Sequence, residues 1–224
     1  MSLPAREREL FAPVDADIAA AGSRAAKLAA LARHVRVCEL CPLSRSRRHA
    51  VPGEGSARAR LMIVGEGPGA SEDDTGRPFA GRSGAQLDRM LAEAGILRRS
   101  TFITNVVKCR AADEAGGRWH NRPPRAAEIK ACRPYLARQI AILRPRVILC
   151  LGAWAGRSII GPGFGIGSGR GRWFAGPSQS DVIATYHPAY IQRGGPGISG
   201  KRLERLARAD LESVSRRLKA RKTT

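Results

Sequence analysis

The stretch Leu61-Met62-Ile63-Val64-Gly65-Glu66-Gly67-Pro68-Gly69 decides the fold that the sequence predicts. Its four leading apolar residues are typical of a strand that is buried on both faces of a sheet. The three glycines that follow permit tight turns and a close approach of the backbone to a ligand. Ligands of open α/β sheets bind beyond the carboxyl ends of the strands. We therefore interpret this stretch as a strand leading into a ligand-binding loop, although glycines after a strand also occur in ordinary loops.

Three further apolar runs, at residues 101–107, 146–152 and 181–186, predict three more buried strands. Segments with helical periodicity separate them, and strands that alternate with helices form a parallel sheet with helices on both faces. We expect an α/β fold of three layers (αβα) around a central, mostly parallel, four-stranded sheet. Three polar residues at strand ends should converge on one edge of this sheet: Glu66, Asn105 and His187.

The length of 224 residues suits one substantial core, so we expect a single domain over residues 1–224. Residues 1–14 contain two prolines and no sustained period, and we expect an irregular arm there. No run approaches ~18 apolar residues, and the amino terminus lacks the pattern of a signal peptide. We expect a cytoplasmic protein without a membrane partner, and a monomer.

The charge of the chain is strongly positive. Lys and Arg number 39 against 19 Asp and Glu, which gives a formal net charge of +20. Such a charge indicates a polyanionic partner, either nucleic acid or an anionic membrane surface. The alternative is that the arginines only solvate exposed faces.

Five cysteines in a cytosolic chain are unlikely to form structural disulfides, so metal or cluster binding is the better interpretation for any cysteines that are grouped. Cys38 and Cys41 form a CxxC turn, which by itself could be a redox pair, half of a zinc site or half of an iron–sulfur site. Cys109 and Cys132 lie further along the chain. Cys150 lies inside an apolar run, where a cysteine usually behaves as a small core residue.

Three groups of motifs occur in a fixed order along residues 38–193. They are Gly65-Glu66-Gly67-Pro68-Gly69 with Thr75-Gly76-Arg77-Pro78-Phe79-Ala80-Gly81, then Thr104-Asn105-Val106-Val107-Lys108-Cys109, and finally His187-Pro188-Ala189-Tyr190. With these motifs the chain resembles the iron–sulfur-containing family four group of uracil-DNA glycosylases. The resemblance implies a DNA repair enzyme that flips uracil out of DNA and hydrolyses its N-glycosidic bond, leaving an abasic site.

The resemblance implies a uracil-binding site made of Gly67, Phe79, Asn105 and His187. The Asn105 amide can donate to O4 and accept from N3–H, a pattern that cytosine presents in reverse. Phe79 would stack on the base. His187, with backbone N–H groups of the Glu66–Gly67 turn, would hydrogen-bond O2, where negative charge develops. The ordinary alternatives are an Asn that caps a turn and a Phe that belongs to the core.

The expected catalytic residues are Glu66 and His187. Family-one relatives carry an Asp where this chain has Gly67, so no Asp base is available there. We expect Glu66 to orient the water or to stabilise the cationic sugar. Glu72 and Asp73 are further candidates, and each could equally be a solvated loop carboxylate.

The resemblance also implies that Cys38, Cys41, Cys109 and Cys132 hold a four-iron four-sulfur cluster. Thiolate chemistry alone barely separates such a cluster from tetrahedral zinc.

The residues after His187 are the expected DNA contacts. By resemblance, Tyr190 or Ile191 would fill the gap that the flipped base leaves, and Arg193 would hold a phosphate. The alternative is an ordinary turn between a strand and a helix.

One segment departs from the family pattern. Twenty-two residues, 110 to 131, separate Cys109 from Cys132, and the surplus falls in a loop from Ala111 to His120. This loop contains Arg118-Trp119-His120 and is partly similar to a basic loop through which neighbouring relatives trap the sugar covalently on a histidine. Those relatives have a Gln where Gly67 stands and more Lys and Arg. We therefore favour a loop that contacts DNA over covalent trapping by His120.

Two other classes of protein compete with a glycosylase. A non-catalytic protein of the same fold could bind damaged bases without cleaving them, but Asn105 and His187 argue against it. A zinc-bearing hydrolase of free nucleotides would explain a pocket but leaves the net charge of +20 without a purpose.

Overall fold

A computed structural model describes residues 5–220 of the chain. Its main sheet has six strands in the order β1-β3-β2-β6-β8-β7. The four inner strands pair in parallel, whereas β1 and β7 pair antiparallel at the two edges. The strands are β1 (Glu54–Gly55), β2 (Leu61–Gly65), β3 (Thr101–Asn105), β6 (Val147–Leu151), β7 (Trp173–Ala175) and β8 (Asp181–Thr185).

The α/β class and the mostly parallel sheet are confirmed, but the predicted number of four strands is wrong. The four predicted strands are β2, β3, β6 and β8. The two additional strands have two and three residues, which is too short to give a readable alternation of apolar and polar side chains.

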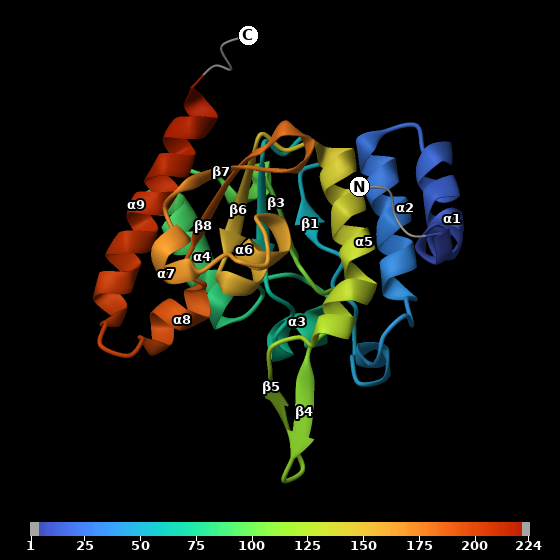
Figure 1. Cartoon of the computed structure of the whole chain (residues 1–224), viewed down its shortest axis with the longest axis horizontal. Coiled ribbons are helices and arrows are strands. Elements are labelled where there is room, and N and C mark those ends of the chain that lie inside the picture. The colour runs from blue at the N-terminus through green and yellow to red at the C-terminus, as the bar shows by residue number, and fades with distance from the viewer. Residues whose placement is uncertain (1–4, 221–224) are drawn as a thin grey trace.

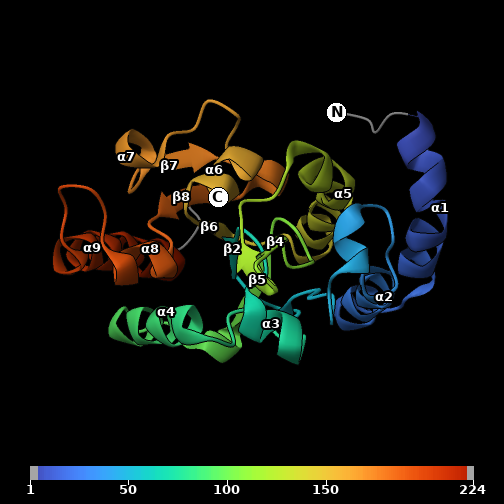
Figure 2. The same cartoon turned by 90° about the horizontal axis from the view of Figure 1, so that it is seen from below.

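Helices cover both faces of the sheet, as Figures 1 and 2 show. Met62 and Val64 point to one face, where they join the core beneath α5, whereas Leu61 and Ile63 point to the other, beneath α4 and α9. This alternation explains why an uninterrupted apolar run is needed in β2. The helices are α1 (Ala5–Ala20), α2 (Arg24–Arg36), α3 (Ala70–Thr75), α4 (Arg82–Glu93), α5 (Ala126–Leu143), α6 (Ala153–Ile159), α7 (Ile166–Gly169), α8 (Pro188–Arg193) and α9 (Gly200–Lys219). None of these helices, within residues 5–220, is both long and apolar enough to span a bilayer.

The amino-terminal segment corrects another expectation. The predicted irregular arm over residues 1–14 is wrong for residues 5–14, which belong to α1, while residues 1–4 lie outside the described part of the chain. Phe11 is 2% exposed, and its ring lies 5.1 Å from that of Tyr135 in an edge-to-face contact. Arg138 pairs with Asp15 at 2.6 Å. These contacts anchor α1 to α5 despite Pro13 inside the helix.

The predicted loop from Ala111 to His120 is a β-hairpin that projects beyond the sheet, as Figure 1 shows. Its strands are β4 (Ala112–Ala115) and β5 (Arg118–Asn121). Gly116 and Gly117 form the turn with φ angles of +59° and +70°. Positive φ at both central residues is what a two-residue hairpin turn of type I′ requires.

Candidate active site

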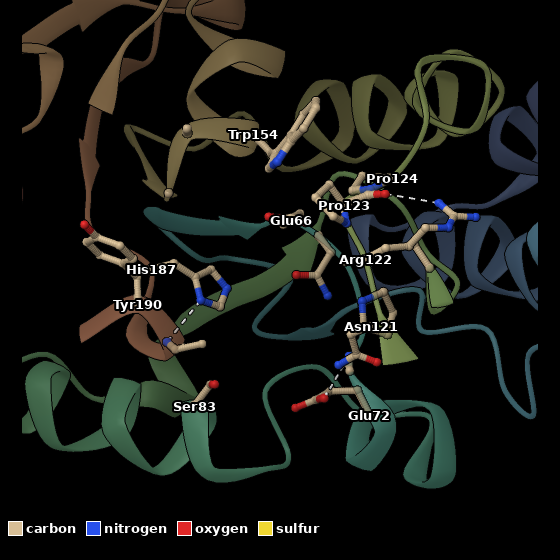
Figure 3. Close-up of a pocket in the computed structure, with 18 of the residues that line it drawn as sticks. Glu66, Glu72, Ser83, Asn121, Arg122, Pro123, Pro124, Trp154, His187 and Tyr190 are labelled. Atoms are coloured by element: carbon tan, nitrogen blue, oxygen red, sulfur yellow. Dashed lines mark hydrogen bonds between the residues drawn. The ribbon is translucent and has the colours of Figure 1, made fainter. Parts of the chain in front are cut away.

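A cavity of about 540 Å³ lies at the carboxyl edge of the parallel strands. Its walls come from the loops after β2, β3, β6 and β8 and from the base of the β4–β5 hairpin. Figure 3 shows Glu66, Trp154 and His187 around this space. The cavity brings together seven of the predicted uracil-binding, catalytic and DNA-binding residues: Glu66, Gly67, Phe79, Asn105, His187, Tyr190 and Arg193.

Asn105, the last residue of β3, lies in the wall of this cavity with only 2% of its surface exposed. Its Oδ1 is buried and has no hydrogen-bond partner among the described residues. A Cβ atom at Gly65 would lie 2.3 Å from this Oδ1 and 2.7 Å from Phe79 Cζ. Only glycine at position 65 therefore lets the amide and the aromatic ring approach the end of β2. A buried acceptor without a partner is costly and points to a ligand that satisfies it.

Lys108 holds the main chain of Asn105 in place through a hydrogen bond. It is not among the site residues that the sequence predicts. Its side chain is 1% exposed, and Nζ donates to the Asn105 main-chain oxygen at 2.6 Å, to Thr104 Oγ1 at 2.7 Å and to Gln139 Oε1 at 2.8 Å. Burial lowers the pKa of Lys108 to about 8. Three acceptors match its three donors, which compensates for its burial and fixes the backbone at the end of β3.

Phe79 forms part of the cavity wall in a backbone conformation that is uncommon for a residue other than glycine. Its φ angle is +52°, and its side chain is 7% exposed. A Cβ atom at Gly84 would lie 1.8 Å from the Phe79 carbonyl oxygen, so the first turn of α4 must carry a glycine there. The Phe79 and His187 rings lie 5.8 Å apart at 30°. Such a maintained left-handed residue is typical of functional sites.

His187 follows β8 and is the N-cap of α8. Its Nδ1 accepts a hydrogen bond from the Ala189 backbone N–H at 3.2 Å. Burial, and then the positive charge of Arg193, lower the pKa of His187 to about 4. The imidazole is therefore neutral at pH 7, and because Nδ1 is an acceptor, its proton resides on Nε2.

Glu66 is the carboxylate of the cavity that has no structural partner. It is half-buried, and its side chain makes no hydrogen bond or ion pair with another residue in the range 5–220. Burial raises the pKa of Glu66 to about 7, with Arg193 opposing the shift. A carboxylate that titrates near neutral pH in a cavity is a candidate for catalysis.

The other two predicted carboxylates hold loops in place. Glu72 accepts hydrogen bonds from the backbone N–H groups of Gly69 and Gly81, both at 3.0 Å. It lines the cavity at the start of α3, as Figure 3 shows, but both of its oxygens are engaged.

Asp73 is buried and does not line the cavity. Its Oδ1 accepts from the backbone N–H groups of Arg48 and His49, at 3.0 and 3.3 Å. The contacts of these two carboxylates leave Glu66 as the acid that is free to act on a ligand.

The predicted DNA-contacting residues on α8 divide into two kinds. Tyr190 and Arg193 line the cavity, and the Tyr190 ring lies 5.7 Å from that of Tyr186. Ile191 is 4% exposed and belongs to the core that α4 and α9 share, so it cannot enter a duplex without leaving that core. The sequence could not separate these neighbours because a six-residue helix is too short for a clear period.

Several residues of the cavity wall were missed. Trp154 lies in the first turn of α6, directly after the third predicted strand, and the rule that sites follow strand ends could have found it. Asn121 and Arg122 come from the base of the hairpin, directly after the segment from Ala111 to His120 that the sequence predicts as a loop.

The position of His120 in the hairpin bears on covalent trapping. Neighbouring residues of a strand point to opposite faces, and Asn121 lines the cavity. His120 therefore points away from it, and it does not contribute to the cavity wall.

The four grouped cysteines come together at a second, small cavity of about 20 Å³. Arg47 Nη1 donates to Cys109 Sγ at 3.2 Å, and the Lys108 backbone N–H donates to Cys132 Sγ at 3.3 Å. Burial raises the pKa of the Cys41, Cys109 and Cys132 thiols. Within residues 5–220, no three His, Cys, Asp or Glu side chains are placed to share a single metal ion. Cys150 lies apart, fully buried in β6, as expected for a core residue.

The cavity combines a buried amide, an aromatic ring, a neutral imidazole and a free carboxylate, so the chain is an α/β protein with a polar cavity at the carboxyl edge of its sheet. Residues 52–212 match the family described as the uracil DNA glycosylase superfamily. The chain belongs to this superfamily.

Similar proteins named Type-4 uracil-DNA glycosylase cover most of the chain. The relative from Pyrobaculum aerophilum is 41% identical over 174 residues, which are 75% of this chain and 85% of the relative. The relative from Thermotoga maritima is 39% identical over 188 residues, 82% and 91% of the two chains. The relative from Saccharolobus solfataricus is 41% identical over 167 residues, 71% and 74% of the two chains. The resemblance to the family four group is thereby confirmed.

Proposed function

We propose that this protein is a DNA repair glycosylase that binds uracil flipped out of DNA and hydrolyses its N-glycosidic bond. The observation that carries the proposal is the unpartnered Oδ1 of Asn105 in the cavity wall. The amide offers one acceptor and one donor, which pair with uracil N3–H and O4, whereas cytosine presents the reverse pattern. Selection follows because a mismatched base would leave buried polar groups unpaired, at about 1–3 kcal/mol each.

Two rings hold the base in this proposal. Phe79 stacks on uracil, and its fixed left-handed backbone keeps the ring beside Asn105. His187 Nε2–H donates to uracil O2, where negative charge grows as the glycosidic bond breaks. The low pKa of His187 keeps the imidazole neutral. A neutral imidazole still has one N–H donor, on Nε2, and this donor can stabilise the leaving anion. Backbone N–H groups of the Glu66–Gly67 turn would assist.

Glu66 acts on the sugar side of the bond. Its ionised carboxylate stabilises the cationic sugar or orients the attacking water. Gly67 leaves no room for the aspartate that family-one relatives have, since a Cβ atom there would lie 2.8 Å from Val107 Cγ2.

The ionisation of Glu66 predicts a pH dependence. The raised pKa, about 7, means that the carboxylate forms only as pH rises through 7. The single-turnover excision rate should therefore rise about tenfold from pH 6 to pH 8. His187 stays neutral above about pH 5 and adds no step in this range. Glu66→Gln should be slow and flat over the same range, and an equal rise in that variant would assign the titration elsewhere.

The residues proposed to contact DNA are those of α8 that line the cavity. Tyr190 rather than Ile191 would fill the gap left by the flipped nucleotide, because Tyr190 lines the cavity whereas Ile191 is buried in the core. Arg193 lies close enough to Glu66 and His187 to shift the pKa of both, and it would hold a phosphate there. The net charge of +20 favours DNA over free nucleotides as substrate.

The expectations that the protein is cytoplasmic and that it is a monomer stay predictions.

We also propose that Cys38, Cys41, Cys109 and Cys132 hold a four-iron four-sulfur cluster. The four thiols line one cavity, and N–H groups already point at two of the sulfurs. Each iron of such a cluster takes one thiolate, so the sulfurs surround the group rather than meet at one point. The cluster would join the end of α2 to the loop after β3 and to α5.

The proposed ligand set predicts opposite results for two cysteine substitutions. Replacing Cys132 by alanine should reduce bound iron from about four atoms per chain to nearly none, with loss of visible absorbance and of solubility. Cys150→Ala removes a thiol outside the set that is buried even more completely than that of Cys132, and it should keep both iron and colour. Iron analysis and absorbance of freshly purified protein distinguish these outcomes, and bleaching by Cys150→Ala would refute the ligand set.

The function is tested with end-labelled duplexes that carry one uracil, thymine or hypoxanthine. Excision is measured as strand breakage at the abasic site in hot alkali, and we expect it for uracil. The released product should be free uracil, and no DNA should stay on the protein after boiling in detergent, since His120 faces away from the cavity. Tight binding of uracil-DNA without excision would favour the non-catalytic alternative.

A further inference from the structure

The β4–β5 hairpin carries an exposed aromatic side chain close to the cavity. Trp119 is 47% exposed, and it shares one face of β5 with Asn121, which lines the cavity. Trp119 and Asn121 are two positions apart on the strand, so Trp119 lies about 7 Å from Asn121 toward the tip of the hairpin. A DNA strand that delivers a flipped nucleotide to the cavity must continue past the rim, so the nucleotides next to the flipped one pass close to Trp119; about 7 Å is two steps at the ~3.4 Å axial spacing of a DNA strand.

The hairpin is fixed at its base. Arg110 donates to Asn121 Oδ1 at 2.7 Å and to the Trp119 main-chain oxygen at 3.2 Å. Arg122 forms a bidentate pair with Glu128 of α5, at 2.8 and 2.7 Å. An exposed tryptophan on a fixed arm loses little conformational entropy when it binds a ligand.

The charges around Trp119 indicate which part of a DNA strand it meets. Glu114 lies directly opposite Trp119 in the register and makes no ion pair within the described chain. A carboxylate at this point disfavours a phosphate, whereas the flat face of a base stacks on an indole ring without regard to sequence. Arg118 and His120 lie on the other face of the hairpin.

We propose that Trp119 is a stacking platform for a nucleobase of the uracil-bearing strand, one or two nucleotides from the flipped uracil. This inference rests on the proposed function, because that function places DNA across the cavity. It gives the inserted hairpin a role in holding single-stranded or locally opened DNA, and it makes Trp119 a binding residue that takes no part in bond cleavage.

The platform is tested with a single-stranded oligonucleotide in which a tetrahydrofuran abasic analogue replaces deoxyuridine. Versions carry 2-aminopurine at the first or second position on either side of it. Trp119→Ala should weaken binding by about 5- to 100-fold and should remove the fluorescence quenching that stacking causes at one of these positions. Trp119→Phe should retain most of both effects. His120→Ala, on the opposite face, is the matched control and should bind as the wild type does.

The outcomes separate the two proposals. Wild-type protein that excises uracil, together with Trp119→Ala that binds and quenches as the wild type does, would overturn the platform alone. Absence of uracil excision by the wild type would overturn the proposed function. Unchanged thermal unfolding of Trp119→Ala would show that any loss of binding comes from the ring and not from misfolding.

Discussion

Asn105→Ala should reduce the single-turnover excision of uracil by about 10²–10³-fold. The substitution removes two hydrogen bonds to the base, each worth about 1–3 kcal/mol in a buried site, and 1.36 kcal/mol corresponds to a factor of ten. Affinity for undamaged duplex should stay near that of the wild type, because phosphate contacts supply nonspecific binding. The measurements are excision of uracil from a labelled duplex and a binding titration with the uracil-free duplex.

Asn121→Ala provides the matched control for this substitution. Asn121 also lines the cavity, but its Oδ1 is already bonded to Arg110. It should therefore lose less than about tenfold in excision rate. If Asn105→Ala excised uracil as fast as Asn121→Ala does, the amide of Asn105 would not be the group that reads the base.

The parts of the fold that could be predicted are those that burial dictates. The strands β2, β3 and β6 are buried at every position, so each must be apolar or fully hydrogen-bonded along its length, and this leaves an unbroken run in the sequence. An edge strand such as β7 pairs on one side only and has three residues. It leaves no such pattern.

The first part of α1 and the β4–β5 hairpin were not predicted, because local sequence signals there disagree with the structure that forms. Pro13 lowers the expectation of a helix, yet burial of Phe11 against Tyr135 stabilises α1 through tertiary contacts. Gly116-Gly117 is a known hairpin signal, but the strands beside it are exposed and carry charged residues, so they lack the apolar alternation of a typical strand.

The sequence could predict which strand ends form the candidate site, but it could not predict how the loops around the site contact one another. The carboxyl ends of parallel strands meet at one edge, which is why Glu66, Asn105 and His187 could be expected together. The spacing could not show that Glu72 is occupied by two backbone N–H groups while Glu66 is free, because those contacts depend on how the loops fold over one another. The burial of Ile191 next to Tyr190, which is only partly buried and lines the cavity, has the same origin.

His187→Ala should slow single-turnover excision by about 10²–10³-fold, the effect of removing one donor from an oxyanion site. The Nε2–H of the neutral imidazole is aimed by the Ala189 N–H bond to Nδ1, so the donor is in place before the bond breaks. Binding of DNA that contains the tetrahydrofuran analogue should change little, because that DNA has no base to contact. The loss should therefore appear in the chemical step and not in affinity.

Two companion variants sharpen this last prediction. His187→Gln keeps an N–H donor of similar reach and should recover part of the rate, whereas a purely structural role of the ring would not be restored by an amide. His34→Ala removes a histidine that pairs with Asp17 on α1 and does not line the cavity, and its rate should stay within about twofold of the wild type. If His187→Ala excised uracil as fast as His34→Ala, the stabilisation of the leaving anion would have to come from the backbone N–H groups of the Glu66–Gly67 turn alone.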